Sequence, residues 1–218
     1  MTTDQVVALT TKQIVGLSTA QIAALTTTQV VAIETADVAA LKTTQVQALT
    51  TAQAVALTTN QVQALTSSQI ASLTTRQLTG AFSTDMVVAL TTDQVSNLTT
   101  AQVAALTTAQ VAAIETIDIK ALTTAQVAVL STAQVAALQT ADLAALSTSA
   151  IAALSTAQVV QGLSTAQIAA LSTAQIASLT TAQVAALTTA QVNQGLTTTQ
   201  VAALSTDAVA ALTTAQIN

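Results

Sequence analysis

The octapeptide Leu98-Thr99-Thr100-Ala101-Gln102-Val103-Ala104-Ala105 repeats, with substitutions, along the whole chain of 218 residues. We number its positions from slot one (Leu98) to slot eight (Ala105). Slot one then recurs from Met1 to Leu212, which gives 27 units separated by eight residues except at three steps of nine. The three long steps end at residues 82, 163 and 196, and each carries a glycine just before its end: Gly80, Gly162 and Gly195.

The eight-residue period favours a helix that is broken once per unit. A continuous α-helix advances about 100° per residue, so slot one would drift around the helix axis by about 80° per unit and form no apolar stripe. A flat strand would place the apolar slots one and six on opposite faces, and Ala, a poor strand former, dominates slots four, seven and eight. A β-solenoid would need regular Gly, Asn or Asp corners, which the units lack.

The break is marked by a capping box. Slot two is Ser or Thr in all but four units and slot five is mostly Gln, so nearly every unit contains Ser/Thr-x-x-Gln. The slot-two hydroxyl is expected to accept from the slot-five N–H, while the Gln side chain reaches back to the slot-two N–H. Helices are therefore expected from about slot three to slot eight.

Six units replace the slot-five Gln. Three have Asp there and a long polar residue at slot two, in the pairs Glu34/Asp37, Glu115/Asp118 and Gln139/Asp142. Three have an apolar residue at slot five and a polar residue at slot four, in the pairs Asp85/Met86, Ser149/Ala150 and Asp207/Ala208. In the first set the longer side chain is at slot two and the shorter one at slot five, the opposite of Ser/Thr-x-x-Gln, and we interpret these pairs as reversed caps. In the second set a polar side chain at slot four remains near the positive end of the helix. Lys42 with Gln45 fits neither pattern.

We therefore predict an all-α fold: a single repeat α-solenoid over residues 1–218, with about 27 very short helices coiled into a narrow rod and slots one and six facing inward. The octads are grouped into a longer repeat, which we call the superrepeat. Its evidence is that Ile33-Glu34-Thr35-Ala36-Asp37 recurs as Ile114-Glu115-Thr116-Ile117-Asp118, at an offset of 81 in residue number. It indicates either duplication of a ten-unit block or a solenoid with five units per turn.

The composition argues against most molecular activities. The chain has no His, Cys, Tyr or Trp, so it lacks the usual acid-base groups, thiolates and soft metal ligands, and we predict that it is not an enzyme. Four basic residues against nine acidic ones, a net charge of -5 and no aromatic platform predict no nucleic-acid partner. The basic residues are Lys12, Lys42, Arg76 and Lys120. Apolar runs of about five residues are too short to span a membrane, and the first residues do not form a secretory signal.

No catalytic, cofactor-binding or metal-binding residue is predicted, and no cofactor or small-molecule substrate is evident. The Glu34/Asp37 and Glu115/Asp118 pairs are explained by capping better than as acid-base dyads. Phe82 and Met86 are interpreted as repacking at a glycine-bearing seam. The slot-five amides are also compatible with ladders between successive coils.

Slot three leaves two interpretations open. It is Thr in every unit except one, where Ser67 replaces it. The simpler interpretation is a corner residue whose methyl packs and whose hydroxyl serves the backbone. The alternative is an exposed lattice of stacked threonines that binds ice or another repetitive solid.

The whole chain resembles the LTTAQVAAL-type octapeptide arrays of large bacterial secreted or surface proteins, some of them adhesin-like. That resemblance implies an extracellular or cell-surface stalk and carries over no functional residue. Both terminal units follow the common pattern, so the chain is expected to self-associate end to end. The leading hypothesis is a non-enzymatic structural spacer or fibre-forming subunit; the alternative is a surface that binds through its threonines.

Overall fold

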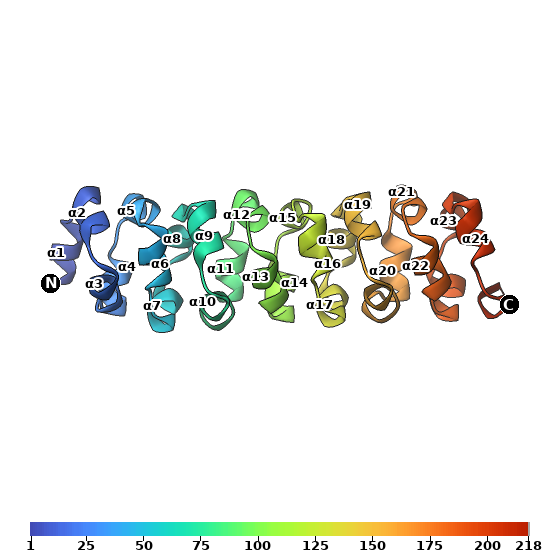
Figure 1. The fold of residues 1–218 in the computed structure, drawn as a ribbon, viewed down its shortest axis with the longest axis horizontal. Coiled ribbons are helices and arrows are strands. Elements are labelled where there is room, and N and C mark those ends of the chain that lie inside the picture. Colours follow the sequence, from blue (N-terminus) through green and yellow to red (C-terminus); the bar gives the residue numbers. More distant parts are fainter. Residues whose placement is uncertain (218) are drawn as a thin grey trace. The chain divides into compact units, whose positions relative to one another are not determined.

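The computed structural model describes residues 1–217, which form 27 short helices and no strand (Figure 1). The chain divides into two compact units, Met1–Ile114 (unit 1) and Glu115–Asn218 (unit 2). The predicted all-α repeat solenoid is confirmed within each unit.

Unit 1 contains fourteen α-helices: α1 (Thr3–Val7), α2 (Thr11–Gly16), α3 (Thr19–Ala23), α4 (Thr27–Val31), α5 (Thr35–Ala40), α6 (Thr43–Gln47), α7 (Thr51–Ala56), α8 (Thr59–Ala64), α9 (Ser67–Ser72), α10 (Thr75–Ala81), α11 (Thr84–Val88), α12 (Thr92–Ser96), α13 (Thr100–Ala105) and α14 (Thr108–Ala113).

The described part of unit 2 contains eleven α-helices and two π-helical segments: α15 (Thr116–Ile119), α16 (Thr124–Ala128), α17 (Thr132–Ala137), α18 (Thr140–Ala145), α19 (Thr148–Ala152), η1 (Gln158–Gly162), α20 (Thr165–Ala170), α21 (Thr173–Ala177), α22 (Thr181–Ala186), η2 (Gln191–Gly195), α23 (Thr198–Ala203), α24 (Thr206–Ala210) and α25 (Thr214–Ile217).

Where a helix ends at slot eight, the residues of slots one and two alone separate it from the next helix; where it ends earlier, as α1 does at Val7, a residue in α conformation (Ala8) precedes them. In the unit that begins at Leu57, Leu57 has φ/ψ of -57°/136° and Thr58 has -76°/158°, after which α8 begins at slot three. The Leu65 N–H then closes the last turn of α8 by donating to the Val62 carbonyl at 3.2 Å. Among the described residues none has a positive φ, so the corners need no glycine.

Within each unit a helix packs against the helix three positions further along the chain, as α4 does with α7 and α18 with α20 (η1 lying between α19 and α20). Hydrogen bonds from slot-five glutamines join many of the helices to the helix four positions earlier, as α8 is joined to α4. One turn of each solenoid therefore takes between three and four repeats. The interpretation of the superrepeat as two turns of five repeats is wrong, because the contacts between coils recur three and four repeats apart.

The core of each unit lies on the coil axis. Slots one and six face inward as predicted: Val62 is fully buried and Leu65 is 3% exposed. From Asp37 onward slot five is buried as well, which the sequence did not lead us to expect, and Gln61 is 2% exposed. Slots two, three and four lie mainly at the surface.

Each nine-residue repeat holds its extra residue inside its helix. In unit 1 α10 lengthens to seven residues and contains Gly80. In unit 2 the insertions form η1 and η2, and the Leu196 N–H donates to the Gln191 carbonyl, five residues earlier, at 3.1 Å.

The two π-helical segments place their glycines against the preceding coil. A Cβ on Gly162 would lie 3.0 Å from the Val135 side chain and 3.1 Å from the Thr132 carbonyl oxygen. A Cβ on Gly195 would lie 3.3 Å from Thr165 backbone atoms, whereas one on Gly80 would meet only a methyl at 3.6 Å. The glycines of η1 and η2 are therefore needed for close approach between coils.

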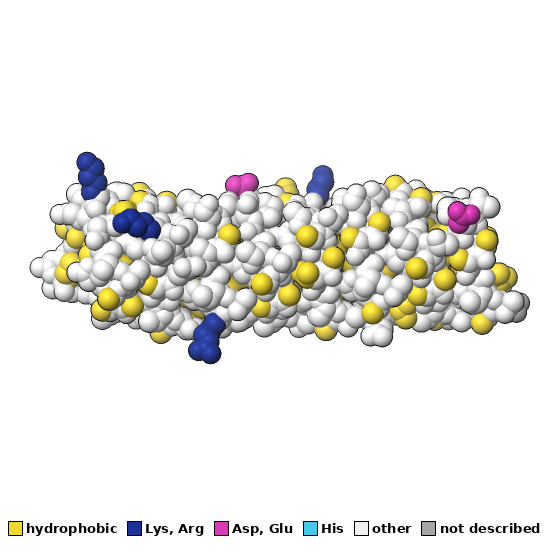
Figure 2. Space-filling view, viewed as in Figure 1, with side chains coloured by type: hydrophobic (Ala, Val, Ile, Leu, Met, Phe, Trp, Pro, Cys, Tyr) yellow, Lys and Arg dark blue, Asp and Glu magenta, His cyan; other side chains and the backbone are white. Residues whose placement is uncertain are grey.

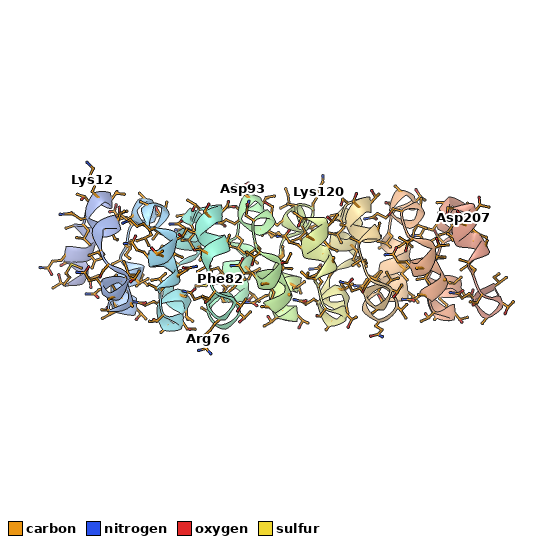
Figure 3. The ribbon with its side chains drawn as sticks, in the orientation of Figure 1. Lys12, Arg76, Phe82, Asp93, Lys120 and Asp207 are labelled. Carbon is orange, nitrogen blue, oxygen red and sulfur yellow. The ribbon has the colours of Figure 1, made fainter. Side chains whose placement is uncertain are left out.

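Phe82 and Met86 belong to the core beside the α10 insertion, where they are 4% and 5% exposed. Phe82 is labelled in Figure 3. Phe82 ends α10 in extended conformation, and Met86 lies within α11 at slot five. Their placement agrees with repacking at the longer repeat.

Candidate functional site

The capping box predicted for the octads is present along both units. In α7 the Gln53 N–H donates to Thr50 Oγ1 at 3.2 Å, and the Thr50 N–H donates to Gln53 Oε1 at 2.7 Å. These two bonds satisfy donors that have no partner within the helix. At Lys42 only the second bond is possible, and the Lys42 N–H donates to Gln45 Oε1 at 2.8 Å.

The same glutamines also bind across coils through the amide nitrogen. Gln61 Nε2 in α8 donates to the Val30 and Ile33 carbonyl oxygens, both at 2.9 Å, at the end of α4. Helix α4 is four positions before α8, so this bond joins one coil to the previous one. We call this arrangement the interturn clamp.

Fifteen glutamines form interturn clamps within their own unit. They donate to the slot-six carbonyl of the helix four positions earlier, to the slot-one carbonyl that follows it, or to both: Gln45, Gln53, Gln61, Gln69, Gln77, Gln94, Gln102, Gln110, Gln158, Gln167, Gln175, Gln183, Gln191, Gln200 and Gln216. The sequence allowed amide ladders between coils, but the partners of the amide nitrogens are backbone carbonyls.

A sequence signal for the interturn clamp does exist. Gln occupies slot five in 21 units and Glu in none. A capping box accepts either residue, because both offer an oxygen to the N-cap N–H. Only Gln also supplies a donor, so the exclusion of Glu indicates that slot five needs one.

The slot-five aspartates lie in the core and act as acceptors. Asp142 is 1% exposed; its Oδ2 accepts from the Gln139 N–H at 2.9 Å and its Oδ1 from the Thr116 hydroxyl at 2.6 Å. Asp37 and Asp118 are also buried, and neither Glu34 nor Glu115 makes a side-chain cap bond. The backward bond of a reversed cap is seen at the Gln139/Asp142 pair.

The three apolar residues at slot five also lie in the core. Met86 is 5% exposed, Ala150 is fully buried and Ala208 is 1% exposed. None of these side chains can donate to the preceding coil.

Charged and metal-binding groups form no cluster on the described residues. No group of three or more Asp, Glu, His or Cys within residues 1–217 is placed to hold a metal ion. On the face shown in Figure 2 the Lys, Arg, Asp and Glu side chains are scattered. Lys12 and Arg76 project away from unit 1 (Figure 3). None of the described helices has both the length and the apolar character that a membrane span requires.

Slot three lies at the surface, as the threonine-lattice hypothesis requires. It is exposed in most units and half-buried in five: Thr3, Thr51, Ser67, Thr132 and Thr165. Two of its hydroxyls donate to carboxylates in the next coil, Thr116 to Asp142 and Ser67 to Asp93, the latter at 3.1 Å.

Comparison with protein families gives a match over most of the sequence. The model of the ALTTAQ repeat matches residues 1–32, 30–67, 79–108, 111–141, 135–173 and 160–194. The comparison with curated proteins gave no match.

Proposed function

This chain belongs to the ALTTAQ repeat family, and from that premise we propose that it is a non-enzymatic structural spacer whose length is set by the number of octads. The observation that carries the proposal is the interturn clamp. Each clamp joins a helix to the preceding coil through two backbone carbonyls, which lie at equivalent slots from one clamp to the next. An added repeat with Gln at slot five can therefore form the same hydrogen bonds as the repeats before it.

The chemistry of the clamp supports this role. Each clamp pairs a buried polar side chain completely, with its oxygen on the N-cap N–H and its nitrogen on the preceding coil. Buried polar groups that are fully paired favour one register over alternatives. Octads with nearly identical sequences would otherwise slip past one another.

Duplication of one superrepeat tests the spacer role. Insertion of a second copy of residues 82–162 is expected to leave the helicity per residue unchanged and to raise the maximum dimension in small-angle X-ray scattering at constant cross-section. A growing cross-section, or loss of helicity, would show that the octads do not act as length units.

We place the spacer outside the cell or at its surface, following the resemblance to secreted octapeptide arrays. Antibody labelling of intact cells, with permeabilised cells as the control, tests this. Labelling restricted to permeabilised cells would contradict the assignment.

The exposure of slot three favours one second candidate, a surface that binds ice or another repetitive solid. Thermal hysteresis of the purified protein measures it. The triple change Thr59→Lys, Thr84→Lys and Thr108→Lys is expected to abolish any hysteresis, whereas Ala109→Lys at the neighbouring exposed slot is the single-site control. Hysteresis that survives the triple change would exclude the threonine lattice.

A further inference from the structure

Four exposed valines lie one to a coil in unit 1. They occupy slot seven of α1, α4, α7 and α11: Val7, Val31, Val55 and Val88. Their exposed fractions are 46%, 45%, 53% and 44%, and within residues 1–114 Met1 is the other large hydrophobic residue that is exposed. We call these four residues the valine row.

The valine row stays on one side of the solenoid. Helix α4 packs against α1 and against α7, three positions away in each case, and α11 is four positions after α7. Because one turn takes between three and four repeats, a step of three falls short of a full turn and a step of four passes it. The last step therefore reverses the drift of the first two. Val15, the remaining slot-seven valine of unit 1, lies on α2 and is half-buried.

The exposure of the row follows from slot seven, which faces away from the coil axis. Within residues 1–114 no slot-seven residue is buried. Val31 and Val55 have coils on both sides of them, and they are exposed to the same extent as Val7. Exposed apolar side chains that are grouped on one side, rather than scattered singly, are typical of an interaction surface.

Carboxylates flank the valine row at its two ends. Slot four lies beside slot seven on the surface of a helix, because it is three residues earlier. Slot four is Asp4 in α1 and Asp85 in α11, whereas the two middle helices have Thr28 and Ala52 there. All four of these residues are exposed. The row thus has an uncharged centre and acidic ends.

The charges select among partners. The four helices of the row contain no Lys or Arg, and the three cations of unit 1 are Lys12 on α2, Lys42 before α6 and Arg76 on α10. A second copy packed row against row would oppose Asp4 or Asp85 to the same acidic residues in either orientation. Like charges opposed across an interface disfavour that complex, whereas an apolar partner with cationic ends gains attraction at both.

The length of the row matches a helix. From α1 to α11 the row spans three steps between coils, and at about 8–10 Å between packed helices this is about 24–30 Å. An α-helix rises about 1.5 Å per residue, so about 16–20 residues cover the row. A helix with apolar residues along one face presents a continuous apolar surface to all four valines.

We propose that the valine row binds a basic amphipathic α-helix of a partner protein, with the apolar face of that helix on the four valines and its cationic ends beside Asp4 and Asp85. The row adds a binding surface to the spacer. It leaves the interturn clamps untouched, because slots four and seven contribute no side chain to them.

Fluorescence anisotropy of a labelled synthetic peptide, titrated with the full chain, measures the binding. The peptide has about 18 residues, with Leu along one helical face, Lys at both ends, and Ala and Gln elsewhere. One control peptide has the same composition in an order that gives no apolar face, and a second has Glu in place of Lys. The basic amphipathic peptide is expected to bind with a Kd of about 1–100 μM, and both controls at least about tenfold more weakly.

Variants of the chain test the residues of the row. Val31→Ser with Val55→Ser is expected to weaken binding about tenfold, whereas Val129→Ser, at an exposed valine outside the row, is expected to leave it unchanged. Asp4→Asn with Asp85→Asn is expected to weaken binding about fivefold and to remove most of its dependence on salt concentration. The exchanged side chains are exposed, so circular dichroism is expected to give wild-type helicity for each variant.

Four results would overturn the proposal: no binding of the basic peptide up to about 1 mM, a control peptide that binds as tightly, wild-type affinity in the valine variant, or unchanged salt dependence in the aspartate variant. Sedimentation velocity of the chain alone provides a fifth. A dimer that forms with the wild-type chain and is lost in the valine variant would assign the row to a second copy. None of these results would change the outcome of the superrepeat duplication.

Discussion

The exchange Gln61→Glu separates the interturn clamp from the capping box. The introduced side chain keeps an oxygen for the Thr58 N–H, which donates to Gln61 Oε1 at 3.0 Å. It loses both 2.9 Å bonds to the Val30 and Ile33 carbonyls. Two neutral hydrogen bonds contribute about 2 kcal/mol, and a carboxylate facing two buried carbonyls adds about 1–3 kcal/mol. We expect unit 1 to lose about 3–5 kcal/mol of stability at pH 7.

Gln13→Glu provides the matched control. The Thr10 N–H donates to Gln13 Oε1 at 2.8 Å, and Gln13 is exposed in the first coil. The cap is kept and no clamp bond within the chain is removed, so a change within about 0.5 kcal/mol is expected. Urea unfolding followed by circular dichroism measures both variants, because the chain has no Trp or Tyr. Unfolding is followed at a protein concentration at which the wild-type chain sediments as a monomer.

The Gln61→Glu variant also has a defined pH dependence. Burial and the facing carbonyls raise the pKa of the introduced carboxyl in the folded state above its unfolded value of about 4.3. Its destabilisation, relative to the wild type at the same pH, is therefore larger at pH 7 than at pH 4. Equal losses for the two glutamine variants, or a difference from wild type that does not vary with pH, would refute the interturn clamp as a source of stability.

Four further variants test neighbouring parts of the fold by the same urea assay. Gly162→Ala should lower the free energy of unfolding by about 1–3 kcal/mol, because the new Cβ would lie 3.0 Å from Val135. Gly80→Ala should leave it unchanged or raise it by up to about 1 kcal/mol. Equal effects of the two variants would contradict the close approach at η1. Met86→Gln restores a donor at slot five and should stabilise unit 1 by about 1 kcal/mol; a loss would indicate that Met86 packing outweighs the clamp. Thr99→Val removes the oxygen that accepts from the Gln102 N–H at 3.2 Å and should cost about 1 kcal/mol, and no change would count against the cap.

The local structure was predictable because its causes lie within one octad. Ser or Thr at slot two and Gln at slot five specify where a helix begins, and the apolar slots one and six specify its buried side. The eight-residue period excludes a continuous helix by simple geometry. These features depend on residues within a single repeat, such as Thr58, Gln61 and Val62.

The arrangement between coils was not predictable in the same way. The partners of Gln61 lie 28 to 31 residues away, and many octads offer the same slots, so no local pattern selects among them. The number of repeats per turn depends on the angle at each two-residue corner, which the side chains do not encode directly. The absence of Glu from slot five was the available signal that Gln serves a second partner.

Side-chain amide hydrogen exchange, observed by NMR on dilute monomeric protein, tests the interturn clamp most directly. The Nε2 hydrogens of Gln53 and Gln61 are expected to exchange far more slowly than those of Gln5, Gln13 and Gln21, because only the former are buried and donate to the preceding coil. Equally rapid exchange at all five would contradict the clamp and, with it, the mechanism by which successive coils are held together.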